Sequence, residues 1–398
     1  MKKRILFIGT GGTIASEMSD EGLLPGVGAS ALLGYVPDVA ELCEAESVQL
    51  FELDSTNIGP DEWLEMARTV RRNYSRFDGF VISHGTDTMA YTAAALSYLI
   101  QRSPKPIILT GAQKPIGFDT TDSRQNLRDA FACACDGGIH GVCIVFNGRV
   151  ILGTRARKTH SKSFDAFSSI NYPNIAAVRD GRILRYIEPE HLPEPKFYGG
   201  LDTRVGLLKL IPGTEPELLE FMLRRCRALV IESFGVGGLP ERGGMHALVK
   251  SAAREGKAIV MTTQVQNEGS DLAVYGTGSA LARSPGIMEA YDMTTEAAVA
   301  KLMWLLPLAV SPADIPRLFY TPVSKDLLSA APRPAGLLKK RGRLFRRPRG
   351  FYVWAYLPSS RARAWEERPL ASSSSTRSQG PRTPPFICIP LREASAAE

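Results

Sequence analysis

Five short apolar runs constrain the fold of this chain more than any other feature of its sequence. They have the length of buried strands and lie at residues 5–8, 48–53, 80–83, 107–110 and 142–146. Helical patterns separate them, one beginning at Pro60 with Asp61 and Glu62 in its first turn. Another begins near Asp122, with Gln125 in the manner of a capping box. Strands that alternate with helices of about 10 to 15 residues predict a parallel sheet covered on both faces.

A weaker α/β pattern follows a break rich in proline and glycine. Residues 188–203, "EPEHLPEPKFYGGLDT", hold three prolines and two glycines. Beyond them we expect strands at 205–211, 229–232 and 258–262, and helices near 215–225, 244–255 and 294–305. The sequence therefore predicts two α/β domains, a larger N-terminal one with a Rossmann-like sheet and a smaller C-terminal one with a parallel sheet. We place them at 1–190 and 204–326, joined by a linker at 191–203.

The basic residues of the chain are concentrated in its last part. Residues 333–398 carry 14 basic and 4 acidic residues, which leaves 34 basic against 37 acidic residues in the remainder. We expect residues 327–398 to form a basic, low-complexity tail without order. A nucleic-acid or membrane-surface arm, or the product of a shifted reading frame, are the alternatives. For the folded part we expect neither a nucleic acid nor a membrane as partner.

The apolar runs and the cysteines of the sequence indicate where in the cell the protein is expected. No apolar run approaches the roughly 20 residues needed to span a bilayer, and the apolar start at 5–8 is too short for a signal peptide. The six cysteines are scattered, without a C-x-x-C pair. These features predict a cytoplasmic protein with reduced thiols.

Thr13 lies in "GTGGT", directly after the first predicted strand. Glycines there let the backbone approach a ligand closely. A dinucleotide fingerprint would need a third glycine where Ile14 stands, and the lysine of a P-loop is absent. The stretch alone indicates a tight turn and a ligand site equally well.

Two further polar segments follow predicted strands. "HGTDT" at 84–88 contains Thr86 and Asp87, which could simply cap a helix, although five polar or glycine residues exceed what a cap needs. Because ligands bind at the carboxyl ends of strands in open α/β sheets, a site near Thr13 is the other interpretation. Lys158 lies in a third polar segment; a lysine is usually solvated, but an inward-facing one could take a proton from a threonine hydroxyl.

Together these three segments resemble the L-asparaginase family, and its cytoplasmic type I branch in particular. The resemblance rests on "TGGTI" at 10–14, "HGTDTM" at 84–89 and "RKTHSKSFDAF" at 157–167, and it covers residues 3 to about 325. It implies hydrolysis of asparagine to aspartate and ammonia, with minor glutaminase activity possible and no cofactor or metal. It also implies a homodimer or a homotetramer built as a dimer of dimers.

The resemblance assigns roles to single residues. Thr13 matches the nucleophile that attacks the side-chain amide, and Thr86, Asp87 and Lys158 match a hydrogen-bonded set. Asp87 would also hold the α-ammonium of the substrate. "LDSTN" at 53–57 matches the loop that binds the amino-acid backbone, with Ser55 as the candidate for the α-carboxylate; its flanking substrate-binding residues are Asp54 and Thr56.

The sequence departs from the family in three places. Leu23 and Leu24 stand where many relatives carry a loop tyrosine that assists the nucleophile. Glu232 and Val265 stand where an arginine and a cysteine belong to a second, regulatory site in some type I enzymes, so we expect no such regulation. Relatives end soon after the position of Ser324, so the tail lies outside the pattern.

Two other functions remain open from the sequence. One is the asparaginase-like subunit of the archaeal amidotransferase that acts on Glu-tRNA; it carries an extra domain ahead of the first signature, which here begins at residue 10. The other is a non-catalytic amino-acid-binding relative that kept the fold. We expect the free hydrolase.

Overall fold

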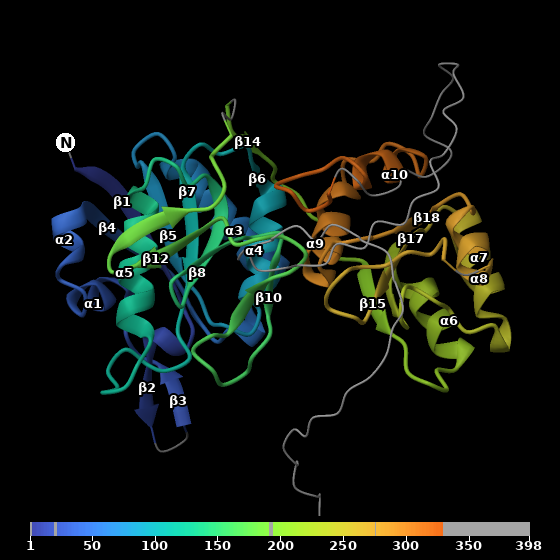
Figure 1. The fold of residues 1–398 in the computed structure, drawn as a ribbon, viewed down its shortest axis with the longest axis horizontal. Helices are drawn as coiled ribbons and strands as arrows, with labels where there is room; N and C mark the ends of the chain where they lie inside the picture. The colour runs from blue at the N-terminus through green and yellow to red at the C-terminus, as the bar shows by residue number, and fades with distance from the viewer. Residues whose placement is uncertain (1, 20–21, 191–193, 275, 329–398) are drawn as a thin grey trace, which may run out of the picture. The chain divides into compact units, whose positions relative to one another are not determined.

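The computed structural model describes residues 2–19, 22–190, 194–274 and 276–328. An eight-stranded sheet forms the N-terminal part, in the order β13-β12-β9-β8-β7-β5-β1-β4 (Figure 1). Its parallel strands are β1 (Lys3–Gly11), β4 (Cys43–Leu53), β5 (Gly79–Ser83), β7 (Pro106–Thr110) and β8 (Gly141–Phe146). Three antiparallel strands extend it: β9 (Arg149–Leu152), β12 (Ala176–Arg179) and β13 (Arg182–Arg185). Each of the five apolar runs lies inside one of the parallel strands.

Both faces of the sheet are covered around its central strands, which explains why β1, β5, β7 and β8 are largely buried and apolar without alternation. In β1, Leu6 and Ile8 pack on the side of α3 (Pro60–Asn73) and α4 (Met89–Leu99). Ile5 and Phe7 pack on the other side, with α1 (Ala29–Gly34), α2 (Val39–Leu42) and α5 (Ser123–Cys135). Successive residues of one strand therefore enter two different cores.

The helix starts confirm one prediction and correct another. The Glu62 carboxylate accepts the Gly59 backbone N–H at 2.8 Å, so α3 begins at Pro60 as expected. The capping box at Asp122 is wrong: its side chain makes no capping bond, because it accepts the backbone N–H groups of Gln113 and Lys114 instead. A carboxylate occupied by another loop cannot cap its own helix.

The C-terminal sheet is parallel, in the order β15-β16-β17-β18. Its strands are β15 (Val205–Lys209), β16 (Ala228–Ser233), β17 (Ala258–Thr263) and β18 (Ile287–Glu289). Its helices are α6 (Pro216–Arg225), α7 (Met245–Arg254), α8 (Gly276–Ala282), α9 (Thr295–Leu305) and α10 (Asp314–Phe319). The sequence analysis did not predict β18, since three residues carry too short a pattern. Two α/β sheets, the larger one N-terminal, confirm the predicted fold class.

Helices α4 and α9 pack against each other and join the two sheets in one core. Ten of the eleven residues of α4 are buried, and ten of the eleven residues of α9. A helix buried on all sides needs neighbours on all sides. The core around them includes Leu6 and Ile82 of the N-terminal sheet and Val230 and Val260 of the C-terminal sheet.

Short elements complete the described chain. The strands pair as hairpins or bridges: β2 (Ser16–Ser19) with β3 (Gly22–Pro25), β10 (Ala156–Lys158) with β11 (Phe167–Ser169), and β6 (Ile100–Gln101) with β14 (Lys196–Phe197). Single turns of 3-10 helix lie at Thr13–Ala15, Ser55–Asn57 and Arg242–Gly244. The predicted linker thus contains strand β14, and the domain boundaries stay a prediction. Of the predicted tail, residues 329–398 lie outside the described residues.

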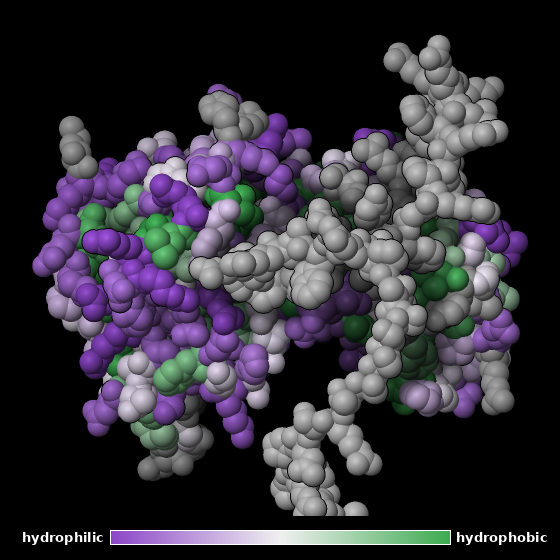
Figure 2. Space-filling view, viewed as in Figure 1, coloured by the Kyte–Doolittle hydropathy of each residue, from purple (hydrophilic) through white to green (hydrophobic). Residues whose placement is uncertain are grey.

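Exposed apolar side chains are most evident on the C-terminal sheet. Figure 2 shows hydrophilic residues over most of the visible N-terminal part, whereas hydrophobic residues gather over β15 and α6. Leu207, Leu218 and Phe221 are exposed there. Among the described residues, no helix has the length and apolar character to cross a membrane.

Candidate active site

Lys158 is the centre of the polar contacts among the predicted site residues. It is the last residue of β10, where it pairs with Phe167 of β11. Its Nζ donates to Thr86 Oγ1 at 2.7 Å and to Asp87 Oδ1 at 2.6 Å. The lysine side chain is 17% exposed and the aspartate side chain 59% exposed. The structure therefore brings Lys158 to two adjacent residues that lie 72 and 71 positions earlier in the sequence.

Two glycines bring Thr13 beside this group. β1 and β5 are neighbours in the sheet, with Gly9 opposite Ser83, so the turns after both strands begin at the same edge. Gly12 has a φ of 80°, and a Cβ added to it would lie 2.3 Å from the backbone nitrogen of Gly85. The two backbones are thus in contact, with half-buried Thr13 following one glycine and Thr86 following the other. A side chain at either glycine would separate the two threonines.

Ser55 approaches the same point from β4. It begins the 3-10 turn after that strand and is 3% exposed. A Cβ added to Gly85 would lie 2.7 Å from Ser55 Oγ, so the hydroxyl faces this glycine. Thr88 Oγ1 donates to the Ser55 carbonyl at 2.6 Å and ties the two turns together.

Asp54 and Thr56 bind each other. Asp54 Oδ1 accepts the backbone N–H of Thr56 at 2.8 Å and its hydroxyl at 2.7 Å. These bonds, the hydroxyl first, lower the pKa of the Asp54 carboxyl. Both residues are exposed. In this structure they stabilise the turn that positions Ser55.

Gln113 belongs to the same group, and the sequence analysis missed it. Its Oε1 accepts from Thr86 Oγ1 at 3.3 Å, and its Nε2 donates to the Ser163 carbonyl at 3.0 Å. The Asp122 carboxylate accepts its backbone N–H at 3.0 Å, the contact that replaces the predicted cap. The hydrogen bonds run in one direction, from Lys158 through Thr86 to Gln113. Gln113 follows β7 at the edge of the sheet where Thr13 and Thr86 lie, and this position is the signal that could have identified it from the sequence.

His84 supports the turn that carries Thr86. It is completely buried, and this burial lowers its pKa to about 4, so the ring is neutral near pH 7. Its Nδ1 lies 2.7 Å from the Gly85 carbonyl, which can only accept, and its Nε2 lies 2.9 Å from Thr92 Oγ1. Trp63 Nε1 donates to the same hydroxyl at 2.9 Å. The donor order Trp63, Thr92, His84 satisfies every group and assigns the proton of the ring to Nδ1.

The structure describes the backbone at the four positions where the sequence departs from the family. Leu23 and Leu24 are in β3, opposite Met18 and Glu17 of β2, on the hairpin that directly follows the turn of Thr13. Glu232 is buried and accepts from Thr295 Oγ1 at 2.5 Å, while Val265 is exposed. Within the described ranges, no three His, Cys, Asp or Glu side chains cluster in a way that could hold a metal ion.

The geometry defines a hydroxyl–amine–carboxylate site at the carboxyl edge of an α/β sheet, which is suited to acyl transfer. The pattern described as Asparaginase, N-terminal, matches residues 4–191, and that of the Glutaminase/Asparaginase C-terminal domain matches residues 204–319. The chain therefore belongs to the asparaginase family of amidohydrolases.

Individual relatives agree with this membership. The chain is 40% identical to the L-asparaginase of Thermococcus kodakarensis over 76% of this chain and 92% of that protein. The solved structure of that thermostable enzyme has a TM-score of 0.78, 37% identity, and coverage of 82% of this chain and 100% of its own. L-asparaginase 1 of Escherichia coli K12 is 33% identical over 77% of this chain and 93% of its own. The chain is also 36% identical to one subunit of the glutamyl-tRNA(Gln) amidotransferase of Methanopyrus kandleri, over 80% of this chain and 73% of that protein.

Proposed function

We propose that this protein hydrolyses L-asparagine to L-aspartate and ammonia, with Thr13 as the nucleophile. The observation that carries the proposal is the pair of bonds from Lys158 Nζ to Thr86 and Asp87, beside the contact of Gly12 with Gly85. The relatives named L-asparaginase support the choice of substrate.

The chemistry asks for an activated hydroxyl, because a free threonine hydroxyl is a weak nucleophile. In the resting arrangement Lys158 donates to Thr86, and Thr86 donates to Gln113. In its ammonium form, lysine has only donor groups, so Lys158 can accept a proton only after it has lost one. We therefore assign to the lysine the role of holding the second threonine and the aspartate, and of accepting a proton only after that loss.

The reaction then has two halves. Thr13 Oγ1 attacks the side-chain carbonyl carbon and gives its hydroxyl proton to the site. The C–N bond then breaks, and the amide nitrogen takes up that proton and leaves as ammonia. Water then attacks the acyl ester, which releases aspartate and restores the hydroxyl. We assign to Thr86 either the orientation of this water or a share in activating Thr13.

Substrate binding uses the charged ends of the amino acid. The exposed Asp87 carboxylate offers an acceptor for the α-ammonium, and Ser55 offers a hydroxyl for the α-carboxylate. Asp54 and Thr56 contribute by holding the turn of Ser55, since their polar groups are bonded to each other. The fixed spacing of these groups orients the amide toward Thr13.

Ammonia release from asparagine by the purified full chain tests the proposal. We expect Thr13→Ala and Thr86→Ala to lose at least 100-fold in rate, and Thr214→Ala, in a loop of the C-terminal sheet, to match the wild type. If Thr86 orients the water, a quenched reaction of Thr86→Ala should show an aspartyl ester on the peptide that contains Thr13; if Thr86 activates Thr13, no ester should accumulate. Equal slow release by the wild type and Thr13→Ala would exclude the nucleophile.

The similarity to the Methanopyrus kandleri amidotransferase supports a second candidate, in which the ammonia is used to amidate Glu-tRNA. The two functions differ in their kinetics. A free hydrolase reaches its full rate with asparagine alone, whereas one component of an amidotransferase should need its partner protein and charged tRNA. Steady-state kinetics with asparagine and glutamine separate these cases and measure any minor glutaminase activity.

Two further family properties are carried over as proposals. We propose a homodimer or homotetramer, which sedimentation velocity on the full chain would measure. We also propose a cytoplasmic location, in line with the Campylobacter jejuni structure described as a probable cytoplasmic L-asparaginase. Cell fractionation would test it.

A further inference from the structure

Cys43 and Cys135 lie at one corner of the N-terminal sheet, although they are far apart in the sequence. Cys43 is the first residue of β4 and directly follows α2, and Cys135 is the last residue of α5. Both sulfurs reach carbonyl groups of α2: Cys43 Sγ lies 3.7 Å from Val39 O, and Cys135 Sγ lies 4.0 Å from Leu42 O. The two thiols also share a hydrogen bond.

The surroundings make the two thiols unequal. The bond with Cys135 and burial raise the pKa of Cys43, which is 2% exposed. The same bond, as the main cause, and the charge of Lys3 lower the pKa of Cys135, against the opposing effect of burial. Lys3 is the residue of β1 that stands opposite Cys43 in the sheet, so a positive charge is built into this corner.

Cys135 is therefore a partly exposed thiol with a lowered pKa, and Cys43 is its buried neighbour, because the Cys135 sulfur contacts the carbonyl of Leu42, the residue directly before Cys43. This combination is typical of redox-sensitive pairs, in which one cysteine reacts first and the other resolves the product. Cys133 of α5 and Cys143 of β8 lack this combination. Burial raises the pKa of Cys143 to about 12 and strongly raises that of Cys133, so their thiols stay protonated.

We propose that Cys43 and Cys135 form a reversible disulfide when the protein meets hydrogen peroxide. The Cys135 thiolate attacks one peroxide oxygen, the O–O bond breaks, and hydroxide leaves, which gives a sulfenic acid. The Cys43 sulfur then attacks the Cys135 sulfur, the S–O bond breaks, and water leaves as the S–S bond forms. In total two thiols are oxidised by two electrons, and one peroxide is reduced to two waters.

The disulfide would connect the start of β4 with the end of α5 and close residues 43–135 into a loop. That loop contains Ser55, Thr86, Asp87 and Gln113, so one bond would constrain most of the candidate active site in the unfolded chain. Closing a loop of this length favours the folded state. The oxidised protein should therefore unfold at a higher urea concentration than the reduced one. The inference does not depend on the proposed function.

The test starts from the full chain with Cys388→Ser, because Cys388 lies outside the described residues and its removal keeps it out of the readout. Treatment with hydrogen peroxide at neutral pH should remove two hydrogens from the intact mass. Peptide mapping should find one bond, between Cys43 and Cys135, and dithiothreitol should reverse it. Before oxidation, a limiting amount of iodoacetamide should label Cys135 at least 10-fold faster than Cys226, which is also partly exposed.

Three variants serve as controls for the proposed disulfide. With Cys43→Ala, the sulfenic acid on Cys135 should persist or advance to the sulfinic acid, because no neighbour resolves it. With Cys135→Ala, Cys43 should stay unmodified. With Cys226→Ala, the disulfide should form as in the parent. Sulfinic acid on Cys135 in the parent protein, or labelling of Cys135 no faster than of Cys226, would overturn the proposal; both readouts use protein with the pair intact and do not depend on the folding of a variant.

Discussion

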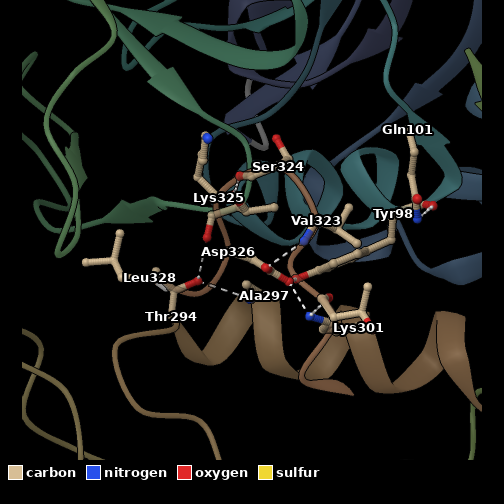
Figure 3. Close-up of polar contacts among 12 residues, drawn as sticks. Tyr98, Gln101, Thr294, Ala297, Lys301, Val323, Ser324, Lys325, Asp326 and Leu328 are labelled. Carbon is tan, nitrogen blue, oxygen red and sulfur yellow. Dashed lines mark hydrogen bonds and ion pairs between the residues drawn. The ribbon is translucent and has the colours of Figure 1, made fainter. Parts of the chain in front are cut away.

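Lys301 of α9 and Asp326 near the end of the described chain form an ion pair of 2.7 Å between two side chains without exposed surface (Figure 3). Tyr98 of α4 donates its hydroxyl to the same Asp326 oxygen at 2.8 Å, and Lys301 also donates to the Thr321 carbonyl at 2.9 Å. The other carboxylate oxygen accepts the backbone N–H of Val323 at 2.9 Å. One carboxylate thus attaches the last described segment to both central helices.

Removing that carboxylate should strongly destabilise the protein. Asp326→Ala leaves the Lys301 ammonium buried without its counter-charge, for which we expect a loss of about 3–5 kcal/mol in the free energy of unfolding. Urea unfolding followed by circular dichroism measures it. Arg224→Ala is the control, since its pair with Glu220 is exposed and should contribute less than about 0.5 kcal/mol. Equal small losses in both variants would show that the buried pair contributes little.

The same pair sets the point where the chain can be shortened. The sequence analysis placed the end of the family pattern near Ser324, but a chain ending there lacks Asp326. We expect a chain ending at Leu328 to keep the fold and the activity, and one ending at Ser324 to lose several kcal/mol of stability or to fail to fold. Thermal unfolding and ammonia release of the two shortened chains, against the full chain, measure this. Loss of activity in the longer one would show that residues 329–398 are needed.

The contact between Gly12 and Gly85 predicts a sharp difference between two glycines. Gly12→Ala would bring a methyl group 2.3 Å from the backbone of Gly85 and would require an alanine at a φ of 80°. The turns of Thr13 and Thr86 must then separate, and we expect at least a 100-fold loss in kcat/KM. Gly117→Ala has open space around the added carbon and should change kcat/KM less than two-fold. Similar kinetics for the two variants would contradict the role of the contact.

The sequence predicted well what depends on local pattern. The five parallel strands of the N-terminal sheet follow from apolar runs. Lys158 is in direct contact with Thr86 and Asp87, while the roles of these residues in a site stay a prediction. It failed where one side chain serves a distant segment. In the sequence the Asp122 carboxylate resembles a helix cap, but in the fold it binds the loop of Gln113. No local pattern around Asp326 predicts its ion pair with Lys301.

Glu289 should make stability depend on pH. It is 5% exposed, and burial, the main cause, raises its pKa from 4.5 to about 7, although its Oε1 accepts the Leu272 N–H at 2.8 Å. The folded state therefore holds a proton that the unfolded state has lost. The stability that this bound proton contributes is fully present below about pH 4.5 and is lost as the pH rises through 7.

We expect Glu289→Gln to remove this loss, because the amide keeps an acceptor for Leu272 and does not ionise. Relative to this variant, the wild type should lose up to about 3 kcal/mol between pH 4.5 and 8. Urea unfolding across that range measures the difference, and Glu220→Gln, at an exposed glutamate, should follow the wild type. Parallel curves for wild type and Glu289→Gln would mean that the carboxyl is already ionised at pH 5.

His84 gives the opposite dependence, next to the site. Its pKa falls from 6.5 to about 4 on burial, so the folded state excludes a proton that the unfolded state binds. Stability from this group is fully present above about pH 6.5 and is lost as the pH falls toward 4. Protonation would place a second N–H against the Thr92 hydroxyl, which already accepts from Trp63, and would disturb the turn at Gly85.

At pH 5 we expect the free energy of unfolding of the wild type to be about 2 kcal/mol lower than at pH 7.5, because at pH 5 the unfolded state binds a proton at His84 that the folded state excludes. His84→Gln should lack this dependence, since glutamine does not titrate, while its lower starting stability reports the lost bonds. His140→Gln, at a histidine that is not fully buried, is the matched control and should keep the wild-type slope. Because the affected turn carries Thr86 and Asp87, the wild-type kcat should fall as the pH drops through about 4, where the ring takes up its proton in the folded state. A kcat that stays constant down to pH 3.5 would show that the protonation state of this ring does not affect the active site.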